Sequence, residues 1–300
     1  MENENRKSNG PRPAATVVIA REHENEFQIY LLQRSNGSRF FPGSYVFPGG
    51  ALDPEDWETN LWADHMDSAP ETLLSRFGGG LDGESAIAYA VAVIRETFEE
   101  AGVFLAQKKN QAPEDLEGVC SLRKSGELPR GWIRERVVSE GWILAFSQLA
   151  RWSHWITPEA MPRRFDTRFF LAFMPDGQAC IPDERETVHG LWVTPEKGLE
   201  GNLGGKVPLS PPTLITLSEL LNYKTFEELK KEARARPWGD PRQPIFIKFP
   251  NGAVIIEPWD PMYGQEFEID PDRLKDKVVP LGEAFSRIWL HEGIWRPIGV

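Results

Sequence analysis

The chain has 300 residues, 40% of them hydrophobic, and a formal net charge of −11. This length allows either two domains or one elaborated domain. The acidic balance argues against a protein that holds nucleic acid through phosphate contacts, since such binding needs clustered Lys and Arg. We also expect no membrane partner, because no stretch has the apolar length needed to cross a bilayer, and the polar segment 1–13 lacks the apolar core of a secretory signal.

The first third of the chain predicts two strands, a glycine turn, an insertion and a long helix. After an expected disordered tail at 1–13, the apolar patterns of residues 16–20 and 27–33 predict strands. A loop at 35–43 and a short apolar run lead to Pro48-Gly49-Gly50, where regular structure breaks. Residues 53–83 are acidic at first and end in three glycines, which suggests an insertion. Apolar residues at helical spacing predict a helix over 85–106 that ends near Gly102.

The remainder predicts a mixture of strands and helices. Residues 107–130 are polar and are expected to form a loop. Further helices are expected at 131–149, 211–221 and 225–235, strands at 152–156, 168–173 and 186–193, and a hairpin at 245–256. Strands and helices without regular βαβ alternation predict an α/β or α+β fold rather than a doubly wound parallel sheet.

The run from Arg95 to Val103 is the most informative part of the sequence. On a helix, Glu96 lies three and four residues before Glu99 and Glu100, so the three carboxylates share one side. Their mutual repulsion would be relieved by a hard divalent cation such as Mg²⁺ or Mn²⁺. An ordinary solvated helix face, with Arg95 and Glu99 as an i,i+4 pair, is the alternative interpretation.

With Phe47-Pro48-Gly49-Gly50 upstream of this run, the chain resembles the Nudix hydrolases. Their signature is Gly, five residues, Glu, seven residues, then Arg-Glu-aliphatic-x-Glu-Glu-x-Gly-aliphatic. Gly50 matches the first position, and the second half matches except that Thr97 stands where an aliphatic residue is usual. Gly50 and Arg95 are 45 positions apart instead of 14, so about 31 residues are extra. Counted back from Arg95, the first glutamate falls on Ile87, and Glu84 is the nearest acid.

A signature interrupted in this way is similar to that of one branch of the family, which contains the peroxisomal coenzyme A diphosphatase of animals and its bacterial relatives. The resemblance implies a Nudix-type α/β/α sandwich around a mixed sheet. It places the Nudix hydrolase domain at 14–235, with the insertion 53–83 inside the signature and a C-terminal extension at 236–300 packed on the domain.

The implied activity is metal-dependent hydrolysis of the diphosphate linkage in a small nucleoside diphosphate derivative, foremost coenzyme A or acyl-CoA. An ADP-ribose, NADH or dinucleotide pyrophosphatase, and a catalytically silent ligand-sensing domain, are the alternatives. The oligomeric state stays open, a homodimer included.

The resemblance also assigns roles to residues. Glu96, Glu99 and Glu100 would hold Mg²⁺ or Mn²⁺, and Arg95 would orient a carboxylate. Gly49 and Gly50 would allow close approach of the substrate, although a simple turn is the alternative for Gly50. Arg34 and Arg164 are candidates for phosphate contacts, as are Arg39, Arg163 and Arg168.

The general base is open at this level. Glu184 and Glu186 could each reach the metal site, and a solvated loop is the alternative for both. His154 and His189 are expected to be structural rather than catalytic. Cys120 and Cys180 form neither a metal-ligand pattern nor a disulfide framework, which favours a reducing compartment, the cytoplasm.

Overall fold

A mixed seven-stranded sheet forms the centre of the molecule. The computed structural model describes residues 10–38, 41–108, 113–126, 128–266 and 268–300. The central strand of the sheet, β1 (Arg12–His23), begins at Arg12, so it includes the last two residues of the tail predicted at 1–13. β1 pairs antiparallel with β2 (Glu26–Arg34) and parallel with β8 (Phe165–Phe173), so the sheet mixes both orientations.

The other strands extend this sheet in the order β3-β2-β1-β8-β7, while β4 joins β1 and β9 joins β2. Their bounds are β3 (Tyr45–Val46), β4 (Gly49–Ala51), β7 (Leu149–Ile156) and β9 (Thr187–Val193). β4 pairs with Ala14, Ala15 and Thr16, and this pairing brings the glycine turn next to the central strand.

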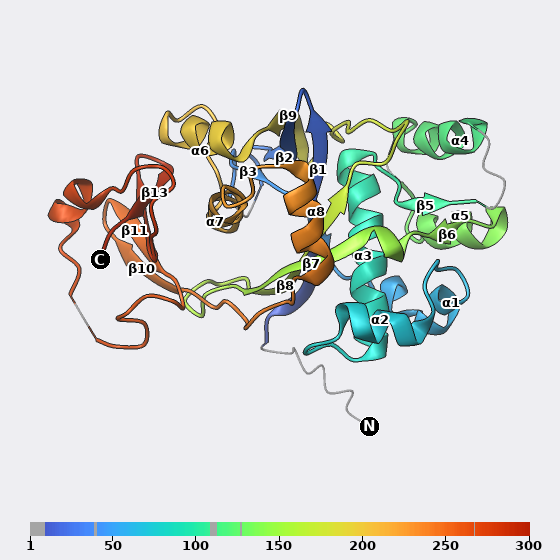
Figure 1. The fold of residues 1–300 in the computed structure, drawn as a ribbon, viewed down its shortest axis with the longest axis horizontal. Coiled ribbons are helices and arrows are strands. Elements are labelled where there is room, and N and C mark those ends of the chain that lie inside the picture. Colours follow the sequence, from blue (N-terminus) through green and yellow to red (C-terminus); the bar gives the residue numbers. More distant parts are fainter. Residues whose placement is uncertain (1–9, 39–40, 109–112, 127, 267) are drawn as a thin grey trace.

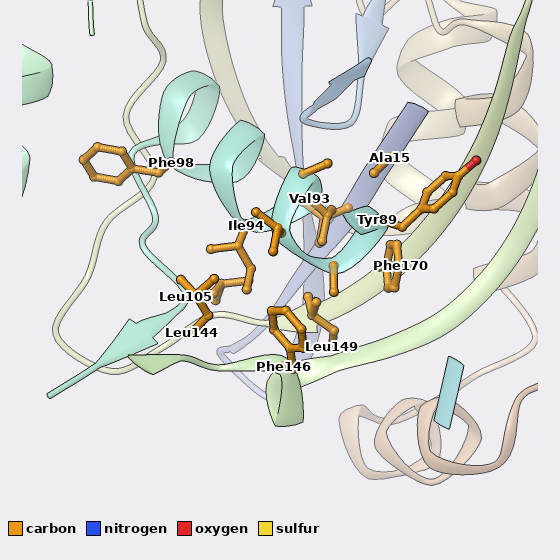
Figure 2. Packing of buried hydrophobic residues seen from close by; sticks show 14 of the residues in the cluster. Ala15, Tyr89, Val93, Ile94, Phe98, Leu105, Leu144, Phe146, Leu149 and Phe170 are labelled. Atoms are coloured by element: carbon orange, nitrogen blue, oxygen red, sulfur yellow. The ribbon is translucent and has the colours of Figure 1, made fainter. Parts of the chain in front are cut away.

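The long helix α3 (Gly83–Ala101) packs on one face of the sheet. Val93 and Ile94 point into a core with Leu105, Leu144 and Phe146, as Figure 2 shows. The insertion adds to the same core through Trp62, Leu73 and Phe77, which are at most 1% exposed. It forms η1 (Pro54–Trp57), α1 (Thr59–Ala63) and α2 (Pro70–Phe77).

Three more helices cover the opposite face, so the sheet has helices on both sides, as the predicted sandwich requires. Leu199, Leu214 and Leu229 from these helices share a core with Val18 and Leu171 of the sheet. The helices are α6 (Pro195–Leu203), α7 (Pro211–Leu220) and α8 (Phe226–Ala235).

The C-terminal segment forms a separate four-stranded antiparallel sheet next to α6 (Figure 1). The predicted hairpin is its first strand pair, β10 and β11. The Asn202 side chain of α6 donates a hydrogen bond of 2.8 Å to the Trp295 carbonyl and so ties the sheet to the domain. The elements are β10 (Ile245–Phe249), β11 (Gly252–Ile256), η3 (Pro271–Lys277), β12 (Arg287–His291) and β13 (Ile294–Ile298).

Two local predictions in the middle of the chain are wrong. The expected loop at 107–130 contains a helix, α4 (Pro113–Lys124). The expected helix at 131–149 is only α5 (Trp132–Glu140), because Gly141 adopts φ 69° and ends it. The following residues form β6 (Ile143–Leu144), paired with β5 (Ala106–Gln107), then η2 (Phe146–Gln148) and the start of β7.

No helix in the described part of the chain is long and apolar enough to cross a membrane.

Candidate active site

The acidic run lies on the last two turns of α3, and its position is fixed at both ends of the helix. Asp82 caps the N-terminus by accepting a hydrogen bond from the Ser85 amide at 2.8 Å. Gly102 ends the helix with φ 73°, as predicted. Arg123 of α4 then donates to the carbonyls of Glu99 and Glu100 at 3.0 Å each, which satisfies acceptors that the helix leaves unpaired. Segment 107–130 was predicted as a loop because it is polar, and this pattern gave no sign that Arg123 belongs to the site.

The charged residues of this run do not form a solvated helix face. Arg95 is 6% exposed and Glu100 is 7% exposed. Arg95 lies within 3.1 Å of three carboxylates: its Nη1 is 2.8 Å from Glu96 and 3.1 Å from Glu99, and its Nη2 is 2.9 Å from Asp56. A fourth carboxylate, that of Asp53, lies 3.9 Å from Nη1. Burial lowers the pKa of Arg95, but these carboxylates outweigh it and raise the pKa above its ordinary value. Arg95 therefore stays a fixed cation inside an acidic cluster.

Asp56 occupies the place of the first glutamate of the signature. It is fully buried and accepts two hydrogen bonds from Arg95, at 3.1 and 2.9 Å. Counted forward from Gly50, five residues separate that glycine from Asp56, which is the ordinary spacing. The extra residues therefore lie after this acid, between Asp56 and Arg95. The spacing before Arg95 predicted Ile87, or Glu84 as the nearest acid, at this place, and that prediction is wrong. Glu84 is exposed on the first turn of α3.

Gly49 and Gly50 allow the backbone of β4 to touch the carboxylates of α3. The Gly49 amide donates a hydrogen bond of 2.8 Å to Glu100. A Cβ at Gly50 would lie 2.4 Å from Oε1 of Glu96, and one at Gly49 would lie 2.3 Å from the Ala15 carbonyl oxygen. Both positions thus need glycine because of close approach, not only because the chain turns there.

The positive charge around Glu96 and Glu100 is too small to keep both carboxyl groups ionised. Burial raises the pKa of Glu96 to about 7 against the attraction of Arg95. Burial and then repulsion by Glu96 raise the pKa of Glu100 well above its usual range. Two adjacent buried carboxylates that resist ionisation are a donor set that a hard cation would complete.

The carboxylates do not converge as a closed metal cage in this arrangement. Within the described ranges, no three His, Cys, Asp or Glu side chains form a group that could hold an ion by themselves. Part of the reason is that Arg95 draws Glu96 and Glu99 toward its Nη1. Glu99 also accepts a hydrogen bond of 2.5 Å from the indole of Trp132. Glu96 and Glu100, next to the backbone of Gly49 and Gly50, are therefore the pair whose chemistry fits a cation best.

A cleft of about 1480 Å³ opens beside this cluster. Strand alternation places Thr16, Thr167 and Phe169 along it, whereas Ala15 and Phe170 face α3. Arg34 and Arg163 line the cleft, as do five basic residues that the sequence did not single out as candidates. These five are Arg12, Arg123, Lys124, Arg130 and Arg185.

The remaining candidates divide between the cleft and other parts of the fold. Glu184 and Glu186 are exposed and line the cleft, and the charge of Glu186 acts on Glu100. Asp183 shapes their loop by accepting hydrogen bonds from the Thr187 amide and hydroxyl at 2.9 and 2.6 Å.

Other predicted residues lie elsewhere. Arg164 is not part of the cleft lining and donates instead to the Thr157 carbonyl at 3.1 Å. Arg168 packs on Trp238, and His154 contacts Asp166 at 2.6 Å. Arg39 lies outside the described residues.

Comparisons with known proteins find Nudix hydrolases. The profile of a family described as the NUDT19 Nudix domain matches residues 75–220. The acyl-coenzyme A diphosphatase NUDT19 of Homo sapiens is 27% identical over 306 residues, which cover 87% of this chain and 80% of that protein. Its counterpart from Xenopus laevis is 26% identical over 331 residues, covering 94% and 85%. The crystal structure of a NUDIX hydrolase from Alicyclobacillus acidocaldarius superposes with a TM-score of 0.59 at 27% identity, covering 76% of this chain and 98% of that one.

Proposed function

The chain is a Nudix hydrolase related to the coenzyme A diphosphatase branch, and from this premise we propose that it hydrolyses coenzyme A or acyl-CoA to 3′,5′-ADP and a 4′-phosphopantetheine. The observation that carries the proposal is the pair Glu96 and Glu100, buried against the Gly49-Gly50 backbone at the edge of a long cleft. The names of the relatives support the choice of substrate.

We assign a divalent cation, Mg²⁺ or Mn²⁺, to Glu96 and Glu100, with Glu99 as a further ligand. When bound, such a cation supplies Lewis-acid stabilisation of charge on the phosphates. The other residues hold this arrangement in place: Asp56 fixes Arg95, Arg95 holds Glu96 and Glu99, and the Gly49 amide holds Glu100. Preorganised groups of this kind lower the barrier because they need not reorient during the reaction.

In the proposed reaction, water attacks one phosphorus of the diphosphate and the bond from that phosphorus to the bridging oxygen breaks. We propose that Glu186 accepts the proton of the attacking water. Its side chain is exposed in the cleft, and its charge is close enough to raise the pKa of Glu100. Arg34 and Arg163 line the same cleft, and their guanidinium groups suit the phosphate oxygens.

Turnover of a substrate panel tests the proposal. Purified protein is incubated with coenzyme A, an acyl-CoA, ADP-ribose, NADH and a diadenosine polyphosphate, each with Mg²⁺ or Mn²⁺, and the products are separated by chromatography. We expect 3′,5′-ADP from coenzyme A and acyl-CoA. Robust hydrolysis of ADP-ribose or NADH without turnover of coenzyme A would favour a dinucleotide pyrophosphatase. Binding without any hydrolysis would favour a silent ligand-sensing domain.

We propose a cytoplasmic protein because its two cysteines are both free thiols.

A further inference from the structure

The C-terminal sheet forms one wall of the cleft. Phe246 of β10, Ile255 of β11 and Trp295 of β13 line it together with Trp155 of β7. The segment before β10 is bound directly to β7, since the Ile156 amide donates to the Arg242 carbonyl at 2.8 Å. In Figure 1 this sheet lies at one end of the molecule, with α3 toward the other. The cleft therefore extends well beyond the carboxylates that would act on a diphosphate.

A row of aromatic rings connects the two parts of the cleft. Phe47 precedes the glycine turn, and its ring centroid lies 6.3 Å from that of Phe169. Phe169 in turn lies 6.4 Å from Trp155, next to the C-terminal sheet. All three rings line the cleft. A substrate whose diphosphate lies at Glu96 and Glu100 can thus extend an apolar chain along this wall.

Glu257, directly after β11, is an unexplained polar group in this apolar wall. It is 0% exposed and belongs to the cleft lining. Neither carboxyl oxygen has a hydrogen-bond partner among the described residues. Arg242 is the cation whose charge acts on Glu257, and its Nη1 lies 2.6 Å from a carboxylate oxygen of Glu219. Burying a carboxyl group in this way is costly unless something else supplies a hydrogen bond.

We propose that this end of the cleft is a subsite for the uncharged, amide-bearing arm of the substrate, and that Glu257 hydrogen-bonds an amide of that arm. The inference rests on the proposed function, in which the leaving half is a 4′-phosphopantetheine. Such an arm has apolar segments that match Phe246, Ile255 and Trp295, and amide groups that need polar partners in an otherwise apolar wall.

The protonation state of Glu257 suits this role. Burial raises its pKa to about 8, with Arg242 opposing the shift and Glu219 reinforcing it. At neutral pH the side chain is therefore mostly a neutral acid, which donates one hydrogen bond and accepts others. A neutral amide offers both a donor and an acceptor in return, and no unpaired charge remains buried.

Calorimetric titration with the two halves of the substrate separates this subsite from the rest of the cleft. The protein and its Glu257→Leu variant are titrated with 4′-phosphopantetheine and, separately, with 3′,5′-ADP. We expect Glu257→Leu to weaken the binding of 4′-phosphopantetheine by about three- to tenfold, the value of one uncharged hydrogen bond. Binding of 3′,5′-ADP should not change. Equal weakening of both halves, or of neither, would overturn the proposal.

Two further variants keep the test decisive. Glu257→Gln retains a donor and an acceptor and should bind 4′-phosphopantetheine nearly as well as the unaltered protein. Ile256→Val changes the neighbouring residue, whose side chain belongs to the core on the opposite face of β11, and should change neither affinity. Should Glu257→Leu fail to fold, Glu257→Ala takes its place, since it also removes the carboxyl group. Weaker binding of 4′-phosphopantetheine in Glu257→Ala than in Glu257→Gln and Ile256→Val would support the subsite, and equal binding in all three variants would overturn it.

The outcome is distinct from that of the turnover assay. Hydrolysis of coenzyme A without any measurable binding of 4′-phosphopantetheine would sink the subsite and leave the proposed function standing. Absence of coenzyme A turnover, with 4′-phosphopantetheine still bound through Glu257, would sink the proposed function and leave the subsite.

Discussion

At the scale of single residues, the site depends on one buried arginine shared by three acids. Arg95 contacts Asp56, Glu96 and Glu99 within 3.1 Å, so each carboxylate is positioned by the same cation. Glu100 is held separately, by the Gly49 amide. Changes at Asp56 and at Glu100 should therefore have different consequences, the first for folding and activity together and the second for activity alone.

Removing the acid at position 56 should damage both stability and turnover. Asp56→Ala leaves part of the Arg95 guanidinium buried without its partner, which we expect to cost about 3 kcal/mol of unfolding free energy. Urea denaturation measures this cost, and initial rates with coenzyme A measure the loss of turnover. Asp56→Glu restores an acid of the type usual at this place in the family and should recover much of both. Equal stability of Asp56→Ala and the unaltered protein would contradict the assigned ion pair.

Glu100→Gln should abolish most of the activity without loss of stability. We expect kcat to fall by about two orders of magnitude or more, because a proposed cation ligand is lost. The melting temperature should stay the same or rise, since burial and Glu96 both disfavour the ionised form of Glu100. Glu84→Gln, on the first turn of the same helix and exposed, is the matched control and should keep full turnover. Retained activity in Glu100→Gln would refute the assignment.

At the scale of elements, helices and strands were predicted correctly where the spacing of apolar residues alone determines the element. α3 was predicted because its apolar positions repeat at helical spacing and Gly102 stops it. The helix expected at 131–149 failed because Gly141 interrupts a run of apolar residues that then continues into β6 and β7. α4 has a weak apolar pattern and was therefore read as a loop. The pairing of Asp56 with Arg95 was missed because 38 residues separate them in the chain, and only their packing brings them together.

The β4 turn should tolerate no side chain at its second glycine. In Gly50→Ala the new Cβ would lie 2.4 Å from Glu96 Oε1, so the carboxylate must move away from its position next to Arg95. We expect kcat to fall by about tenfold or more, as misplacement near a reacting centre does. Gly37→Ala, where the nearest atom would lie 3.9 Å away, is the control substitution in the same cleft. Comparable rates for the two variants would show that the close approach has no catalytic role.

At the scale of the whole molecule, two sheets enclose the cleft, and the second contains a titrating group. Glu257 has a pKa of about 8 in the folded protein against an ordinary value of 4.5. Below pH 4.5 the group is protonated in both the folded and unfolded states. As the pH rises toward 8, the unfolded state loses this proton first, so the native state loses stability over that interval.

This linkage gives a measurable pH dependence. Between about pH 5 and 8, Glu257 should lower the unfolding free energy by up to about 1.4 kcal/mol per pH unit, with no further loss above pH 8. Denaturant titrations of the unaltered protein and of Glu257→Gln across this range isolate the contribution, because other buried acids such as Glu96 are common to both. A difference between the two proteins that stays constant with pH would rule out a raised pKa at Glu257.

The segment between Asp56 and Arg95 also ties the integrity of the site to the stability of the main core. Trp62, Leu73 and Phe77 anchor this segment in the core that α3 and the central sheet share, and Asp56 at its start holds the arginine of the site. Because these side chains are fully buried, the segment should open together with that core and not before it. Withdrawal of Asp56 would then release Arg95 in the same step. On heating, hydrolysis should therefore fail at the temperature at which the sheet melts, and amide exchange over residues 54–77 should increase in step with that loss.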